Sequence, residues 1–293
     1  KLKVKSQEGN GTTVTITISY KVAENYNTSK TKTAESIADK TIKILAADDE
    51  EYNRILLKTI FDNVGVELSL VEDGPDVFDK IKSEDFDVIL LDLRMPKMNG
   101  FDVAKKLRSQ NIEIPIIALS ATVEEDEILK CYECGMNEFV SKPFKEEDLF
   151  KKINKVTRKS SLKSNNQSQQ KDNIKDVAEQ NEIDYSLEPL IAISNEDDNF
   201  VTEMIDVFIQ STQEGVQKIK VALASENMTE IANQAHKMAS PCRHIEALTT
   251  VATLKRIEEF SRKKDSNKEE LTKFVNMLEE KINKLTKALK AER

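Results

Sequence analysis

The sequence has few cysteines and lacks long apolar runs, a signal peptide and an excess of positive charge. Three cysteines among 293 residues form no paired framework, which is typical of a reducing, cytosolic compartment. No stretch reaches the roughly 18 apolar residues of a membrane span. A net charge of −8 argues against a nucleic-acid binder, since phosphate contacts need a basic face. We therefore expect a cytoplasmic chain without membrane contact or direct nucleic-acid binding. Because it begins with Lys1 rather than methionine, we also expect a fragment of a longer protein.

The length predicts about two domains. With 39% hydrophobic residues the chain can build real cores, and with 33% charged residues it is well solvated. Its patterns divide it into a hairpin at 1–20, a linker at 21–41, an alternating strand and helix region at 42–157, a polar flexible linker at 158–186 and a helical region at 187–293.

The first 20 residues predict a short β-hairpin. Strands are expected at 2–6 and 12–20 around Gly9-Asn10-Gly11, because β-branched residues alternate along the second segment. This region resembles the closing hairpin of the ATP-binding domain of histidine kinases through the segment Gly-Asn-Gly-Thr-Thr-Val-Thr-Ile-Thr-Ile. An ordinary hairpin is the alternative. The resemblance implies a remnant of that domain without its ATP-binding core, so we expect no autophosphorylation from ATP.

Strands and helices alternate from Ile42 onward. Strands are predicted at 42–47, 67–71, 87–91, 115–119 and 137–140, and helices near 50–64, 74–83, 100–109, 123–134 and 146–157. Five such units predict an α/β doubly wound fold, with a five-stranded parallel sheet and helices on both faces. After the polar linker, apolar residues recur at helical spacing from Val201 to Leu285, which predicts an all-α bundle of four or more antiparallel helices.

Aspartates stand at the ends of the first and third strands of the sheet. Asp48 and Asp49 follow the first strand, and Asp92 follows the continuous apolar run that begins at Val88. In a doubly wound sheet of order 2-1-3-4-5 these two strands are neighbours, so the three carboxylates converge. They repel one another unless protons or a cation intervene, and oxygen ligands suit Mg²⁺. For the Asp48-Asp49 pair alone, a helix N-cap is the alternative.

Two further strand ends add a hydroxyl and a cation. Ser120 follows the fourth strand and Lys142 the fifth, where a lysine can reach a phosphoryl oxygen or pair with Asp92. Residues 42–157 resemble a response-regulator receiver domain, which has a flavodoxin-like fold. The resemblance rests on Asp48-Asp49, Asp92 with Met95-Pro96 and Gly100, Ser120-Ala121 and Lys142-Pro143.

This resemblance implies that Asp92 accepts a phosphoryl group as an acyl phosphate. Asp49, Asp92 and the backbone carbonyl of Arg94 would bind Mg²⁺, with Asp48 acting through water. Ser120 and Lys142 would hold phosphoryl oxygens, Ser120 and Phe139 would be the switch residues, and the Lys142–Pro143 bond would be cis.

The helical region contains both histidines of the chain. His236 lies next to a core stripe and has small neighbours, which favours access by another protein, and Asn233 one turn earlier is a candidate to orient its ring. Lys237 and Arg243 add positive charge nearby. A plain surface histidine is the alternative, and it is the interpretation kept for His244.

Residues 187–293 resemble a histidine phosphotransfer (HPt) domain through Ala235-His236-Lys237-Met238 after a long helix. The resemblance implies that His236 is a phosphoacceptor. Ala239 and Ser240 stand where lysine and glycine are usual, so electrostatic assistance depends on Lys237 or Arg243. Pro241 is expected to kink or end the helix.

The two resemblances together imply the C-terminal part of a hybrid sensor histidine kinase, whose parent is a candidate for anchoring in the inner membrane. The implied phosphorelay runs from the phosphohistidine domain of a kinase to Asp92, to His236 and on to the receiver of a separate response regulator. Two alternatives remain: a receiver-like module used for docking or regulation without phosphorylation, and a receiver with a non-catalytic helical output domain.

Overall fold

The computed structural model describes residues 2–7, 11–16, 42–120, 125–158, 184–195, 197–263 and 267–292. The chain divides into two compact units, residues 1–32 and 33–293. In the first unit, β1 (Leu2–Gln7) and β2 (Gly11–Ile16) pair antiparallel, with Leu2 opposite Ile16. The predicted hairpin is therefore confirmed. Residues 17–20 of its second strand and the whole linker at 21–41 lie outside the described residues.

The second unit begins with a parallel sheet of five strands. These are β3 (Lys43–Ala47), β4 (Glu67–Val71), β5 (Val88–Asp92), β6 (Ile116–Ser120) and β7 (Glu138–Ser141). Their order is β4-β3-β5-β6-β7, which is the predicted 2-1-3-4-5 arrangement. Every residue of β5 and β6 is buried, as expected for central strands covered on both faces.

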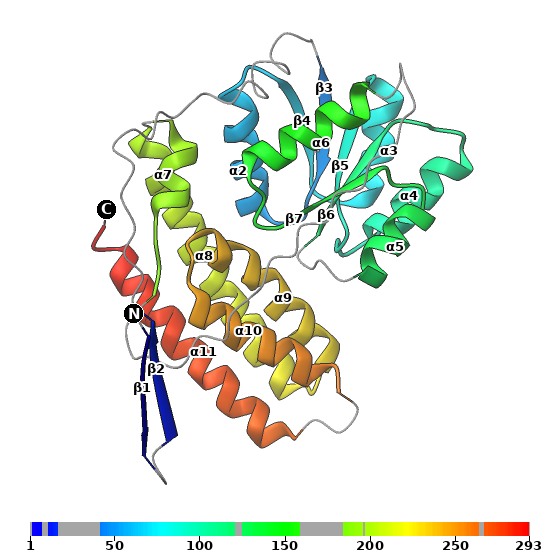
Figure 1. Cartoon of the computed structure of the whole chain (residues 1–293). Helices are drawn as coiled ribbons and strands as arrows, with labels where there is room; N and C mark the ends of the chain where they lie inside the picture. The colour runs from blue at the N-terminus through cyan, green and yellow to red at the C-terminus, as the bar shows by residue number, and fades with distance from the viewer. Residues whose placement is uncertain are drawn as a thin grey trace. The chain divides into compact units, whose positions relative to one another are not determined.

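Helices cover both faces of this sheet (Figure 1). They are α2 (Glu51–Asp62), α3 (Gly74–Ser83), α4 (Gly100–Ser109), α5 (Glu125–Glu133) and α6 (Glu146–Arg158). Alternate strand residues point to opposite faces, so Ile44 and Ala46 join the core under α2 and α6, while Leu45 and Ala47 join the core under α3, α4 and α5. Residues 121–124, where the predicted fourth helix begins, lie outside the described residues.

The turn after β5 is fixed by close backbone packing. The side chain of Asn99 caps α4 by accepting a hydrogen bond from the backbone N–H of Asp102 at 3.0 Å. A Cβ atom on Gly100 would lie 2.4 Å from the backbone oxygen of Asp92. Glycine at this position therefore lets the start of α4 pass directly over the end of the strand that carries Asp92.

The C-terminal part is helical, as predicted. After the short α7 (Glu188–Ser194) come α8 (Asp198–Ala224), α9 (Met228–His244), α10 (Leu248–Ser261) and α11 (Lys268–Leu289). Helices α8 and α10 each pack against both α9 and α11, which makes a four-helix bundle around a continuous apolar core (Figure 1). Within the polar linker, residues 159–183 lie outside the described residues.

Of the two effects predicted for Pro241, a kink or an end of the helix, the end at the proline is not observed, because α9 continues through Pro241 to His244. Proline removes one backbone hydrogen bond and costs about 3 kcal/mol or more in a helix interior. Cys242 and His244 are buried on the far side of the proline. The packing of these side chains holds the last turn in helical form despite the missing bond.

Helix α2 connects the sheet to the bundle. It contacts α7, α8 and α9, and the core under α2 and α6 is continuous with the core of the bundle. The side-chain amide of Asn63, at the end of α2, donates to the backbone oxygen of Ile193 in α7 at 2.8 Å. The two folds thus share apolar packing along one face of the sheet.

Replacing Gly100 by alanine is expected to destabilise the protein by roughly 1–3 kcal/mol, because the new methyl group has only backbone to push against. Gly215→Ala in α8 is the control, since a Cβ there would meet the flexible side chain of Met238. Urea unfolding followed by circular dichroism measures both variants. An equal effect of the two substitutions would contradict the packing argument.

Candidate functional site

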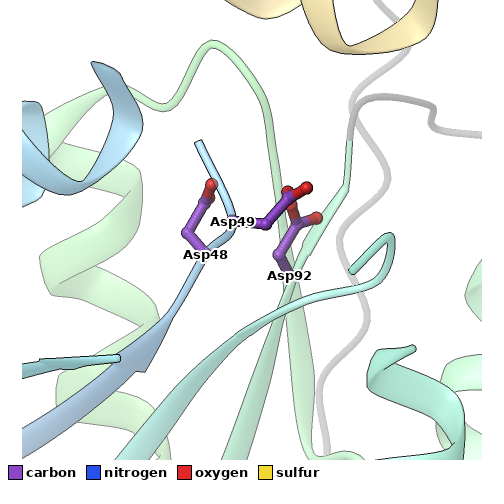
Figure 2. A group of neighbouring side chains, drawn as sticks. All are labelled: Asp48, Asp49 and Asp92. Atoms are coloured by element: carbon purple, nitrogen blue, oxygen red, sulfur yellow. The ribbon is translucent and has the colours of Figure 1, made fainter. Parts of the chain in front are cut away.

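Three carboxylates meet at the carboxyl edge of the sheet. Asp48 and Asp49 follow β3, Asp92 ends β5, and one oxygen from each side chain lies within 4.8 Å of the others (Figure 2). Because β3 and β5 are hydrogen-bonded neighbours, their ends reach the same crevice. The predicted convergence of the three aspartates is therefore observed. The N-cap of α2 is Glu50, so neither Asp48 nor Asp49 takes the alternative role of a cap.

Asp48 is held by donors on several sides. Its Oδ1 accepts from the backbone N–H of Glu50 at 3.0 Å and from the side-chain amide of Asn53 at 3.0 Å. The ammonium group of Lys142 lies 2.7 Å from its Oδ2. Asp48 is fully buried, so these contacts compensate for its lost hydration.

Lys142 neutralises part of the acidic cluster. Its Nζ lies 2.7 Å from Asp48 and 2.9 Å from Asp92, and its side chain is only 4% exposed. Burial disfavours the charged lysine, but the carboxylates of Asp48 and Asp92 outweigh it and raise the pKa of Lys142. Burial raises the pKa of Asp92 to about 7, although Lys142 opposes this. The Lys142–Pro143 bond is cis, as the resemblance implied.

The remaining predicted residues lie near this edge or on its flank. Ser120 ends β6, and its hydroxyl donates to Glu127 of α5 at 2.6 Å. Phe139 in β7 is half-buried, with the ammonium group of Lys152 4.4 Å from its ring centroid. The backbone N–H of Arg94 donates to Asp92 at 3.3 Å. Ser120 and Arg94 thus flank the strand end that carries Asp92.

The donor set suits a small, hard cation. Carboxylate oxygens with room for water are the ligands that Mg²⁺ takes, and Asp48, Asp49 and Asp92 supply them from two strand ends. A site of sulfur or imidazole ligands would instead suit zinc or copper. The chemistry of the three side chains therefore fits the predicted Mg²⁺.

On the bundle, His236 in α9 is held by a carboxylate. Its Nδ1 lies 3.1 and 3.2 Å from the two carboxylate oxygens of Glu258 in α10. The pKa of Glu258 is lowered, through its bond to His236 and nearby arginines, although burial acts the other way. An ionised carboxylate only accepts hydrogen bonds, so we assign the proton of neutral His236 to Nδ1, which leaves a lone pair on Nε2. The predicted partner Asn233 is exposed and does not hold the ring.

His236 and Asp92 line the same small cavity. The other lining residues are Glu50, Arg94, Lys142, Lys237 and Ser240. The volume is about 10 Å³, close to the minimum that holds one water molecule. The His236 side chain is 12% exposed, and residues of the sheet domain line the cavity opposite it.

Polar contacts across the cavity join the bundle to the sheet. The ammonium group of Lys237 pairs with the carboxylate of Asp49. The hydroxyl of Ser240 donates to the side-chain oxygen of Asn53 at 3.1 Å. Lys237 therefore brings a cation to the acidic edge, whereas Arg243 is not among the residues that line the cavity.

His244 is a packing residue. Its ring centroid lies 5.4 Å from that of Tyr52 and 5.7 Å from that of Phe144, both in the sheet domain. Its Nδ1 contacts the backbone oxygen of Ser240 at 3.1 Å. Burial lowers its pKa to about 4, so it is neutral near pH 7. The interpretation of His244 as a plain surface histidine is therefore wrong, because its ring is buried between the bundle and the sheet domain.

Glu258, Asn53 and the cavity-lining Glu50 are site residues that the sequence did not reveal. Glu258 lies on a different helix from His236 and reaches it only through the packing of α9 against α10. Asn53 is buried on the first turns of α2, where it contacts both Asp48 and Ser240. The one local signal is a polar residue on the inward stripe of α2, between Tyr52 and Leu56.

Comparison with known proteins identifies both folds. Residues 44–154 match the family model of the response regulator receiver domain, and residues 203–291 match that of the Hpt domain. The chain therefore contains a receiver domain followed by an Hpt domain, which are the modules of phosphorelay signalling.

Two sensor kinases are among the relatives. Sensor protein EvgS of Escherichia coli K12 is 36% identical over 143 residues, covering 48% of this chain and 12% of EvgS. Sensor histidine kinase GacS of Pseudomonas protegens is 22% identical over 242 residues, covering 79% of this chain and 26% of GacS. Among solved structures, the Francisella response regulator 1452 receiver domain is 30% identical, with a TM-score of 0.39, covering 41% of this chain and 99% of that one.

The matched part of this chain thus spans only 12% and 26% of the length of those two kinases. In the part of the chain that the structure describes, every helix is too short or too polar to cross a membrane.

Lys142→Met is expected to destabilise the protein, more at pH 8 than at pH 5. Breaking a buried ion pair costs roughly 3–5 kcal/mol, because the partner charge stays buried. Without the ammonium group, the pKa of Asp92 in the folded state rises further above its unfolded value. Protonation then relieves the cost at low pH, and stability falls as the pH rises. Urea unfolding at both pH values measures this, with the exposed Lys151→Met as control. An equal loss at both pH values would refute the charge argument.

Nitrogen-15 NMR of the two imidazoles is expected to give a midpoint below pH 6.5 for His236. Burial lowers its pKa, as do the charges of Arg94 and Arg243, while Glu258 acts the other way. Glu258→Gln should therefore lower the midpoint further. His244, with its pKa of about 4, serves as the internal reference. A midpoint of His236 above 6.5 would contradict the assigned environment.

Proposed function

We propose that this chain relays a phosphoryl group from Asp92 to His236. The observation that carries the proposal is the cavity that both side chains line, at the end of a parallel strand on one side and on a bundle helix on the other. A carboxylate and an imidazole are both nucleophiles that form covalent intermediates. Their shared cavity supports a direct exchange between them.

In the first step, Asp92 attacks the phosphorus of a kinase phosphohistidine. The bond between phosphorus and the histidine nitrogen breaks, and a bond between phosphorus and an Asp92 oxygen forms. Lys142 offsets negative charge on the transferring group, and the hydroxyl of Ser120 would turn from Glu127 to a phosphoryl oxygen. Asp48, Asp49, Asp92 and the backbone carbonyl of Arg94 would hold Mg²⁺, which supplies charge neutralisation during the transfer.

In the second step, Nε2 of His236 attacks the phosphorus on Asp92. The oxygen to phosphorus bond breaks, the nitrogen to phosphorus bond forms, and Asp92 returns to a carboxylate. The proton on Nδ1 stays in place, and the Glu258 carboxylate offsets the positive charge that develops on the ring. The cavity of about 10 Å³ is smaller than a phosphoryl group, so Lys237 or its neighbours must move to admit it.

The contacts between α2 and the bundle favour transfer within one chain. Holding donor and acceptor together replaces a bimolecular encounter and raises their effective concentration. The partners we propose are the phosphohistidine domain of a kinase upstream and the receiver of a response regulator downstream. Because the chain's own receiver covers His236, the downstream receiver must take its place.

Several finer points belong to the same proposal. We propose domain limits of 42–157 for the receiver and 187–293 for the HPt domain, joined by the linker at 158–186. The hairpin at 1–20 would be the end of a kinase ATP-binding domain. The cytoplasmic location rests on the cysteine content, and the membrane-anchored kinase parent on the resemblance.

The alternative function is a docking module that is never phosphorylated. The small volume of the cavity favours it, because a phosphoryl group does not fit there without movement of side chains. Binding of a phosphate analogue such as beryllofluoride together with Mg²⁺ separates the two functions, since a pure docking module is expected to bind neither.

Labelling with an acyl phosphate donor such as acetyl phosphate tests the relay. The wild-type chain with Mg²⁺ is expected to gain base-stable phosphohistidine. His236→Gln should retain only the hydroxylamine-sensitive acyl phosphate, and Asp92→Asn should lose both. Chelating Mg²⁺ with EDTA should reduce labelling at least about tenfold, since the metal offsets the charge of the transferring group. His244→Gln is the matched control. Phosphohistidine in Asp92→Asn, or none in the wild type, would overturn the proposal.

A further inference from the structure

The side chain of Arg94 links the receiver to the HPt domain. Arg94 follows the phosphoacceptor strand by two residues, and its guanidinium lies between two carboxylates. Its Nη1 is 3.5 Å from Glu258 of α10, and its Nη2 is 3.8 Å from Glu127 of α5. Glu127 in turn accepts the hydrogen bond of Ser120. Polar contacts thus run from the end of β6 to the carboxylate that holds His236.

Glu258 is the receiving group on the HPt side. It contacts His236 through Nδ1 at 3.1 Å, Arg262 of its own helix at 2.9 Å, and Arg94 of the receiver. Its side chain is 18% exposed and that of Arg94 is 36% exposed. The pair is therefore partly shielded from water, so its charges interact more strongly than those of a fully exposed pair.

The charges at this contact are arranged so that receivers of different charge would bind differently. The receiver edge carries Asp48, Asp49 and Asp92, and Glu258 would bring a further carboxylate toward them. Arg94 is the cation of the receiver that meets this carboxylate. A receiver with an acidic residue there would place like charges side by side, which opposes binding more strongly than the lost attraction alone.

We propose that the Arg94–Glu258 pair is the specificity-determining contact through which the HPt domain recognises its own receiver. The inference rests on the proposed transfer from Asp92 to His236. Arg94 acts here as a docking residue, since it contacts Glu258 and not the reacting nitrogen. A competing downstream receiver meets the same carboxylate, so its residue two positions after the phosphoacceptor is expected to be basic.

The test measures the first-order rate of phosphohistidine formation in the full chain, starting from the measured population of phosphorylated Asp92. Arg94→Ala is expected to slow transfer about two- to fivefold, and Arg94→Glu about tenfold or more. Arg94→Lys should restore most of the rate. Added salt should slow the wild type more than Arg94→Ala, because salt screens the attraction between Arg94 and Glu258, which the variant no longer has. Lys97→Glu, an exposed charge reversal in the same loop, should change little.

The Glu258→Gln background makes the test specific. Glutamine still accepts the hydrogen bond from Nδ1 of His236 but carries no charge, so Arg94→Glu should cause little further loss there. An equal loss in both backgrounds, or an effect of Lys97→Glu as large as that of Arg94→Glu, would overturn the inference. A wild-type chain that forms no phosphohistidine removes the proposed function and the inference with it. Normal transfer in Arg94→Glu removes the inference alone.

Discussion

Three carboxylates within 4.8 Å of one another are the constraint on which the receiver edge depends. Such a cluster is stable only with positive charge close by, and Lys142 supplies it at 2.7 Å from Asp48 and 2.9 Å from Asp92. Strand order makes this possible. The ends of β3 and β5 are adjacent, and β7 ends on the same edge of the parallel sheet. The topology thus places a fixed ammonium group among the acids while leaving oxygen ligands for a divalent ion.

Two ion pairs of opposite direction join the receiver and the HPt domain. The HPt domain extends Lys237 to Asp49 of the receiver, and the receiver extends Arg94 to Glu258 of the HPt domain. Each domain therefore neutralises an acid of the other. The apolar core also continues from α2 into the bundle. In such an arrangement apolar burial supplies most of the binding free energy between the domains, while the two ion pairs determine which surfaces meet.

The sequence predicted the parts of this molecule that local patterns encode. The buried runs that become β5 and β6 have no alternation, and each ends at the polar residue that was assigned to the site, Asp92 and Ser120. The strand order and the convergence of the aspartates followed from the regular alternation of strands and helices. These features depend on residues close together in the chain or on topology rules with few exceptions.

Local sequence patterns could not predict contacts between side chains on different helices. Asn233 was the plausible partner of His236 because it stands one turn away, whereas Glu258 reaches the ring from another helix. Pro241 was expected to kink or end the helix, but α9 continues past it, and the burial of Cys242 and His244 outweighs the local preference for an end. The pairing of Lys237 with Asp49 depends on how two folds dock, which no spacing in the chain records.

The proposed phosphorylation of Asp92 would act on the same few charges that join the two domains. A phosphoryl group on Asp92 would add negative charge where Lys142 and Lys237 already contact the acidic edge. Both ammonium groups gain a new partner at that moment, and Lys237 can leave Asp49 without losing its counter-charge. The cost of moving Lys237 away from Asp49 to enlarge the cavity would therefore be offset by its new contact with the phosphoryl group. Since Lys237 follows His236 directly in α9, such a movement would take place beside the imidazole that we propose as the next acceptor.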